Sequence, residues 1–224
     1  MTAKPARRSF WIVDKAPFIQ RRFPFKFYNA ALIIIGANIV IYFLTMISQN
    51  LLYYLPMWPA QVVINHWWWQ VVTYMFVHGS FTHVLFNMLG LFVFGVALER
   101  KVGSTEFLVF YFVNGTLAGL FSLAVYWFTG QTSVILLGAS GAVYALLVAA
   151  AAYYPTATVN LYFVLPIQIP YLALIYLAID IFGAIRGGTG IAHLTHLSGA
   201  GFAFLYLLIR LRINPIREFR NTRR

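Results

Sequence analysis

Polar residues in three separate apolar segments have the types and spacing needed for nucleophilic catalysis. They are Ser140 in "GASGAVYALL", His196 in "AHLTHLSGAG", and His83 with Asn87 in "FTHVLFNMLG". A serine hydroxyl becomes nucleophilic when a base, usually histidine, takes its proton. The oxyanion that forms needs donors, which the Asn87 amide, the His83 ring and the free N–H groups of a helix start can supply. This set suffices for serine acyl transfer or peptide hydrolysis.

Each of these residues also has a structural interpretation. A lone serine among small residues of a membrane helix is usually a packing contact, and Gly199 with Ala203 forms a small-xxx-small pair typical of helix packing. A lone histidine in such a helix is more often a hydrogen-bonded structural group than a base. Around Ser140, however, Gly138 and Gly141 are expected to keep the backbone open, so that a substrate can approach the hydroxyl.

Asp180 and the remaining histidines are less informative. The position of Asp180 near one end of an apolar segment favours a solvated or loop-capping carboxylate over the third member of a catalytic triad. A metal site built from histidines would use His78, His83, His193 and His196. Such a set lacks a matched carboxylate and an H-E-x-x-H helix, so no metal site is predicted. His66 and His78 are expected to be interfacial or structural.

Composition identifies the elements that must position these groups. Of 224 residues, 61% are hydrophobic and only 9% are charged, whereas a soluble domain carries about a quarter charged residues. The apolar residues form runs of about 20, the length that crosses a bilayer. The sequence therefore predicts an all-α membrane protein with one bundle of six spans, at about 29–50, 81–98, 105–128, 138–153, 160–182 and 190–210.

The basic residues predict how this bundle lies in the membrane. The formal net charge is +11, and fifteen of the sixteen Lys and Arg residues lie before residue 28, after residue 209, or at Arg100–Lys101. This positive-inside pattern places both termini and the 100–101 loop in the cytoplasm. We expect a basic segment at 1–28, the helical domain at 29–210 and a basic tail at 211–224. The basic segments should contact anionic lipid, and no nucleic acid partner is expected.

This topology brings the polar residues to one depth. The second, fourth and sixth spans then run inward, so His83, Asn87, Ser140 and His196 all lie within about 10 Å of the outer helix ends. A site spread through the bilayer, as in a transporter, would place its polar groups near the midplane. The fifth span carries Pro166 and Pro170, which should loosen that helix.

The three motifs, in this order, resemble the rhomboid family of intramembrane serine proteases over residues 65–205. The run "FTHVLFNMLGLFVFGVALERKVGS" is similar to the family's H-x-x-x-N helix and the E-x-x-x-G end that follows it, here Glu99 and Gly103. The runs "GASGAVYALL" and "AHLTHLSGAGFA" are similar to its G-x-S-G and last-helix motifs. One departure is Gln70, where the family typically has arginine after tryptophan, which puts the usual anchoring of the outer loop in doubt.

The resemblance implies a role for each matching residue. Ser140 would be the nucleophile and His196, chosen over His193 by its motif position, the general base of a dyad. His83, Asn87 and the Ser140 backbone N–H would hold the oxyanion, and Tyr144 would pack on the His196 ring. Gly138, Gly141 and Gly199 are the supporting glycines of these motifs.

The resemblance also implies a substrate and a location. The substrates would be transmembrane segments of single-pass proteins, cut near the outer membrane face, with the fifth span as a lateral gate. No metal or organic cofactor is implied, and the expected location is the cytoplasmic membrane of a bacterium. The alternative is a non-catalytic relative that binds client helices, although such relatives usually lack the serine or the histidine. The sequence carries no signature of an oligomeric state.

Overall fold

The computed structural model describes residues 17–161, 164–186 and 191–221. Its long helices are α1 (Ala30–Ile47), α5 (Phe81–Gly90), α7 (Ser104–Phe128), α8 (Ser140–Tyr153), α9 (Ile169–Ile185) and α10 (Ile191–Tyr206). The π-helical turn η3 (Leu91–Gly95) continues α5 into α6 (Val96–Val102), and η4 (Leu207–Leu211) extends α10. Shorter helices are η1 (Phe18–Gln20), α2 (Gln49–Tyr54), α3 (Pro59–Ile64), α4 (Gln70–Thr73), η2 (Tyr74–Phe76) and α11 (Pro215–Asn221).

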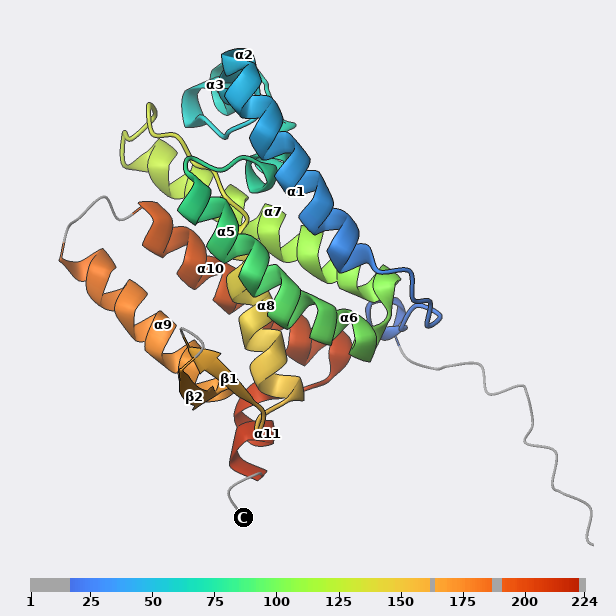
Figure 1. Ribbon diagram of the computed structural model, residues 1–224. Helices are drawn as coiled ribbons and strands as arrows, with labels where there is room; N and C mark the ends of the chain where they lie inside the picture. Colours follow the sequence, from blue (N-terminus) through green and yellow to red (C-terminus); the bar gives the residue numbers. More distant parts are fainter. Residues whose placement is uncertain (1–16, 162–163, 187–190, 222–224) are drawn as a thin grey trace, which may run out of the picture.

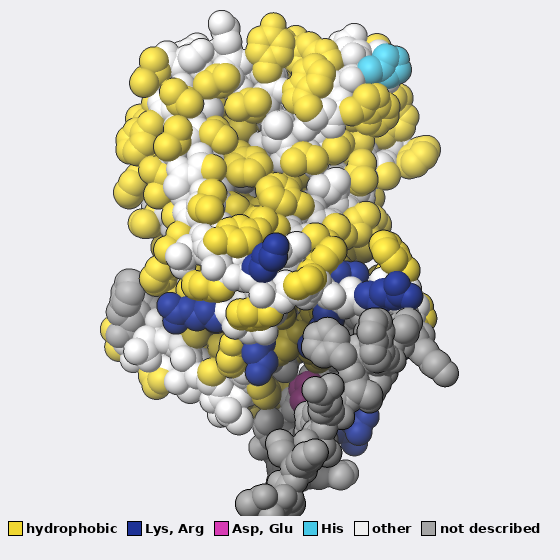
Figure 2. Space-filling view, turned by 90° about the vertical axis from the view of Figure 1, so that its right-hand side faces the viewer, with side chains coloured by type: hydrophobic (Ala, Val, Ile, Leu, Met, Phe, Trp, Pro, Cys, Tyr) yellow, Lys and Arg dark blue, Asp and Glu magenta, His cyan; other side chains and the backbone are white. Residues whose placement is uncertain are grey.

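The protein is an integral membrane protein built mainly of helices. Four stretches of the described chain are long and apolar enough to cross a bilayer, namely Ala30–Ile47, Phe81–Val102, Ser104–Phe128 and His193–Leu211. Helices α8 and α9 are apolar but shorter. On the face drawn in Figure 2, a broad apolar surface ends at a band of lysine and arginine side chains. Some predicted parts lie outside the described residues, namely 1–16 of the basic segment 1–28, 222–224 of the tail 211–224, and the start of the sixth span at 190.

Helix α8 lies at the centre of the bundle. It packs against α7, α9 and α10 and against the α5–α6 segment. Its buried positions are mostly alanines, including Ala142, Ala145 and Ala149. Small side chains let neighbouring helices approach closely where the hydrophobic effect gives little drive for association. Helix α9 lies at the periphery beside α10, as Figure 1 shows.

The prediction for the fifth span was wrong at its start. Helix α9 begins at Ile169 rather than near 160, and the preceding residues form a hairpin of β1 (Thr158–Leu161) and β2 (Leu165–Gln168). Pro166 lies in this hairpin, and Pro170 lies in the first turn of α9. A proline in the first turn costs no helical hydrogen bond, because that N–H has no partner within the helix. The prolines therefore precede and begin α9 and do not loosen it.

Gln70 anchors the outer loop between α1 and α5. Its side chain is fully buried. The Trp58 N–H donates to Gln70 Oε1 at 3.1 Å, and Gln70 Nε2 donates to the Tyr54 carbonyl oxygen at 3.1 Å. Although this position holds glutamine in place of the family's arginine, the loop is therefore still anchored to the first residue of α4.

Glu99 joins the second helical segment to the start of α1. Its carboxylate is buried and accepts hydrogen bonds from the N–H groups of Ala30 at 2.6 Å and Ala31 at 2.9 Å, and from the Ser104 hydroxyl. A carboxylate at a helix N-terminus satisfies free donors and complements the helix dipole. Gly103 turns the chain into α7 with a φ of 86°, close to the Lys26 carbonyl. The E-x-x-x-G motif therefore has a structural role, in which it holds the start of α1 against the start of α7.

A Glu99→Gln variant is expected to be less stable by about 2–4 kcal/mol. The amide keeps the volume but has one acceptor oxygen, so a buried N–H of α1 faces an NH₂ group. Thermal unfolding in detergent would measure the loss as a lower midpoint. Glu218→Gln on the C-terminal helix α11 is the matched control and should unfold like wild type. An unchanged midpoint for Glu99→Gln would show that the hydrogen bonds of the Glu99 carboxylate contribute nothing to stability.

Candidate active site

Ser140 is the first residue of α8. The chain enters this helix through Gly138 and Ala139, and no side chain caps the helix start. The first backbone N–H groups of a helix have no intrahelical acceptor. Here they belong to Ser140, Gly141 and Ala142, so the hydroxyl lies beside uncapped donors at the positive end of a helix dipole.

Gly138 brings His83 against the backbone that precedes Ser140. Its φ of 112° lies in the left-handed region, and a Cβ at this position would stand 2.6 Å from His83 Nε2. Its N–H donates to the Tyr74 carbonyl oxygen at 2.9 Å. The imidazole of His83 therefore occupies the space that a side chain at position 138 would take. Only glycine can combine the positive φ with the lack of space for a Cβ.

His78 supports the same turn from the outer loop. It is buried, its ring centroid is 5.0 Å from that of His83, and its Nε2 accepts a long hydrogen bond of 3.5 Å from the Ala139 N–H. Burial, together with the facing His83 ring, lowers the pKa of His78 to about 4. His78 is therefore neutral at pH 7 and keeps the lone pair that accepts this bond.

Asn87 lies one turn below His83 on the same face of α5. Its side chain is buried, and Nδ2 donates to the His83 carbonyl oxygen at 2.9 Å. An amide nitrogen carries two N–H groups, so this bond leaves the second one for another acceptor. The Ser80 hydroxyl accepts the His83 backbone N–H at 3.2 Å and caps α5.

His196 lies over the first turn of α8. The Tyr144 ring stacks on its imidazole with centroids 4.3 Å apart and planes 11° from parallel, which is the contact expected from the sequence. Thr195, the residue before His196, lies against Gly141 in the first turn of α8. The α5, α8 and α10 groups predicted to share a depth are thus brought together around the start of α8.

Gly141 and Gly199 set the close approach of α8 and α10. A Cβ at Gly199 would collide with the Gly141 carbonyl, and a Cβ at Gly141 would stand 3.0 Å from Thr195 Cγ2. The packing role of Gly199 is therefore confirmed. At Gly138 and Gly141, the space that a Cβ would take is occupied by the His83 ring and by Thr195 of α10, so both glycines permit close packing. That they let a substrate approach the Ser140 hydroxyl stays a prediction.

The prediction that Asp180 is a solvated or loop-capping carboxylate was wrong. Its carboxylate is buried, not solvated, and Oδ1 lies 3.1 Å from His196 Nδ1 and 2.5 Å from His193 Nδ1. Asp180 lies near the C-terminal end of α9, on the side that packs against α10. The signal that could have revealed it was a carboxylate inside an apolar span, which is costly unless it is paired.

These three residues also form the one cluster of the described chain with the composition of a metal site. One ligand atom from each of Asp180, His193 and His196 lies within 4.8 Å of the others. The matched carboxylate that the histidines lacked in the sequence is supplied by α9. Of the histidines considered earlier, His78 and His83 lie elsewhere, beside Gly138 and Ala139.

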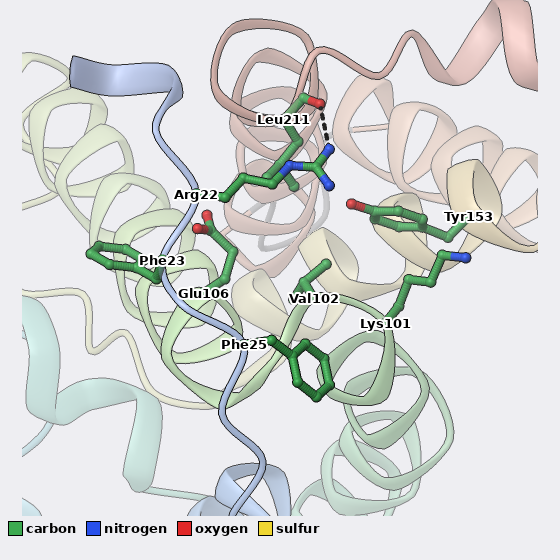
Figure 3. A pocket seen from close by; sticks show the side chains of 8 residues that line it. All are labelled: Arg22, Phe23, Phe25, Lys101, Val102, Glu106, Tyr153 and Leu211. Carbon is green, nitrogen blue, oxygen red and sulfur yellow. Dashed lines mark hydrogen bonds between the residues drawn. The ribbon is translucent and has the colours of Figure 1, made fainter. Parts of the chain in front are cut away.

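A separate cavity of about 180 Å³ lies at the other end of α8. Figure 3 shows Arg22, Glu106 and Tyr153 around it, with the Arg22 guanidinium donating to the Leu211 carbonyl oxygen at 3.2 Å. Ser140 and Tyr153 are the two ends of α8, and its 14 residues make them about 20 Å apart. This cavity has no nucleophile with an adjacent base, so it is not the catalytic site.

Comparison with known proteins identifies the family of this chain. The model of the rhomboid domain matches residues 65–213. The putative rhomboid protease YdcA of Bacillus subtilis is 36% identical over 84 residues, which cover 38% of this chain and 40% of the relative. The rhomboid protease AarA of Providencia stuartii is 34% identical over 105 residues, covering 42% and 37%.

A third relative gives a longer match. The rhomboid protease GlpG of Salmonella typhi is 29% identical over 124 residues, covering 51% of this chain and 45% of the relative. The chain thus spans less than half the length of these relatives. The matched domain contains Ser140, His196 and Asp180, and it covers most of the described helices. The chain belongs to the rhomboid family.

Proposed function

We propose that this protein is an intramembrane serine endopeptidase that cleaves transmembrane segments of single-pass membrane proteins near the outer membrane face. Ser140 is the nucleophile and His196 the general base. The observation that carries the proposal is the position of the His196 imidazole, held between the Tyr144 ring and the Asp180 carboxylate over the first turn of α8. The names of the relatives, which are rhomboid proteases, also support the proposal.

Asp180 extends the expected dyad by orienting the base. When Asp180 Oδ1 accepts the proton on His196 Nδ1, the lone pair of Nε2 is left to accept the Ser140 proton. The hydroxyl oxygen then attacks the scissile carbonyl, and His196 returns the proton to the leaving amine. Water, activated by the same imidazole, hydrolyses the acyl-enzyme. The carboxylate stabilises the imidazolium that forms in each step.

The oxyanion would be held by groups from α8 and α5. The Ser140 N–H at the uncapped start of α8 is one donor, and the Asn87 amide and the His83 ring are the others. Gly138 keeps the His83 ring against this turn. Donors fixed before the reaction stabilise developing charge without reorganisation, and losing one typically costs 10²- to 10³-fold in rate.

The substrate would reach this site through the bilayer. The peripheral helix α9 carries exposed apolar side chains and borders the site through Asp180, so we propose that its displacement from α8 and α10 admits the substrate helix. The positive-inside pattern supports a cytoplasmic location for both termini, with the site near the outer face. We propose a bacterial cytoplasmic membrane as the setting, because several of the relatives come from bacteria.

Labelling with a serine-reactive fluorophosphonate tests this proposal directly. The wild-type chain in detergent should be labelled, and Ser140→Ala should not. Ser198→Ala is the matched control, because this serine is on α10 and donates to the Thr195 carbonyl oxygen at 3.0 Å. Absence of labelling in wild type would favour the alternative, a non-catalytic rhomboid that binds client helices.

A further inference from the structure

We propose that Asp180, His193 and His196 bind a divalent transition metal of the Zn²⁺ type, which reversibly inhibits the enzyme by occupying its general base. The inhibition rests on the proposed function, but the metal site itself does not. The cluster joins one carboxylate on α9 to two imidazoles on α10. The starting point is that His193 has no part in the proposed catalysis, yet it lies 2.5 Å from the same carboxylate oxygen as His196.

The donor set and its spacing suit such an ion. Two imidazoles and a carboxylate are ligands that Zn²⁺ binds at about 2.0–2.2 Å, and three protein ligands leave a fourth position for water. One ligand atom from each residue lies within 4.8 Å of the others. His193 and His196 are three residues apart and so share a face of α10. Small side-chain rotations can therefore bring all three around one ion.

The Asp180 carboxylate has capacity left for a cation. Its Oδ2 is buried and accepts no hydrogen bond from a described residue, although the Tyr144 hydroxyl lies near the carboxylate. The two histidines are the only ion-pair partners of Asp180 in the described chain. Arg186, at the end of α9, instead places its guanidinium 4.3 Å from the centroid of the Phe182 ring. A buried carboxylate without a permanent cation favours a metal ion.

His193 gives the ion a route to the site. Its side chain is 32% exposed, against 16% for His196 and 3% for Asp180. The ring packs directly against Gly183 of α9, where a Cβ would collide with Nε2. This contact turns Nδ1 toward Asp180 and leaves the ligand atoms facing one another. His193 is thus the most accessible ligand of a site whose other two members are largely enclosed.

Occupation of the site would switch off the proposed catalysis. A metal on His196 Nδ1 requires that nitrogen to be deprotonated, so the ring proton resides on Nε2. Nε2 is then a donor and no longer accepts the Ser140 proton. Hard cations such as Mg²⁺ prefer oxygen ligands and should not compete for two imidazoles. The predicted pattern is inhibition by Zn²⁺ or Co²⁺ and none by Mg²⁺.

Binding is tested without activity by cobalt spectroscopy on the full-length Ser140→Ala chain. Co²⁺ should produce visible d–d bands with one ion per chain, and Zn²⁺ should abolish them by displacement. Adding His193→Gln should weaken Co²⁺ binding at least tenfold, because glutamine can still donate to Asp180 but is a poor metal ligand. His66→Gln in the exposed outer loop is the matched control and should leave the bands unchanged. Absent bands, or equal bands in the His193→Gln chain, would overturn the site.

Inhibition is tested on chains that retain Ser140. Zn²⁺ should inhibit reporter cleavage by wild type and by His66→Gln, and chelation should restore it, whereas His193→Gln should need at least tenfold more Zn²⁺. Equal sensitivity of His193→Gln and wild type would refute inhibition through this cluster. If wild type has no protease activity but cobalt binds, the proposed function fails and the metal site stands. If wild type cleaves the reporter but no cobalt binds, the metal site fails and the proposed function stands.

Discussion

A Ser140→Ala variant is expected to cleave a transmembrane reporter at least 10³-fold more slowly than wild type. Loss of the nucleophile in a serine protease removes the covalent route, and rates fall by about 10³- to 10⁶-fold. The residual rate would come from direct attack by water on the scissile carbonyl, which the oxyanion donors still stabilise. Initial cleavage rates in proteoliposomes, with the reporter at saturating density, would measure the loss as a fall in kcat.

The fold of this variant should be unchanged. Ser140 is the first residue of α8, and no side chain caps this helix start, so alanine should leave the thermal midpoint within about 1 °C of wild type. Ser198→Ala controls for the loss of a serine near the site and should keep full activity. Retention of a tenth or more of the wild-type rate by Ser140→Ala would rule out Ser140 as the nucleophile.

An Asp180→Asn variant is expected to lose between about 10-fold and 10⁴-fold in kcat. The same change in a Ser-His-Asp triad costs about 10⁴-fold, because an amide can donate to Nδ1 and stabilise the wrong tautomer of the histidine. The 3.1 Å contact between Asp180 Oδ1 and His196 Nδ1 is the basis for expecting the same effect here. KM for the reporter should change little, because the carboxylate is buried behind the imidazole.

Two controls separate this positioning role from a structural one. Asp180→Glu keeps a carboxylate and should recover part of the lost kcat, although Asn is closer in size to Asp. Ser140 labelling by the fluorophosphonate should slow in parallel with kcat in Asp180→Asn, since both need the same base. If Asp180→Asn and Asp180→Glu lose activity equally, in step with a lower unfolding midpoint, the carboxylate serves only to hold α9 against α10.

Much of the site was readable in the sequence because its information is local. The spacing of His83 and Asn87 places both on one face of a helix, and the small residues around Ser140 mark a helix start. The contact of Tyr144 with the His196 ring, which the family resemblance implied, is present in the structure. The apolar runs and the distribution of lysine and arginine predicted a membrane bundle and a common depth for these groups.

The predictions for the fifth span and for Gln70 were wrong because each sequence pattern is compatible with two structures. Residues 158–161 and 165–168 lie in a stretch that continues without a break into the apolar helix α9, but their backbone groups pair across a hairpin with Thr158 opposite Gln168. Hydrophobicity alone does not distinguish these two ways of satisfying buried peptide groups. Gln70 likewise looked like a lost anchor, because the partners that it binds, Tyr54 and Trp58, are up to 16 residues away in a folded loop.

The sequence by itself determined the membrane bundle and the family motifs, and from these motifs it predicted Ser140 as the nucleophile and His196 as the base. Only the tertiary structure placed Asp180 beside the two histidines and showed what the glycines pack against. Asp180 meets His193 and His196 because α9 and α10 pack side by side, and Gly141 meets Gly199 because α8 and α10 approach until backbone touches backbone. Such contacts depend on distances between helices, and no spacing along one chain segment encodes them.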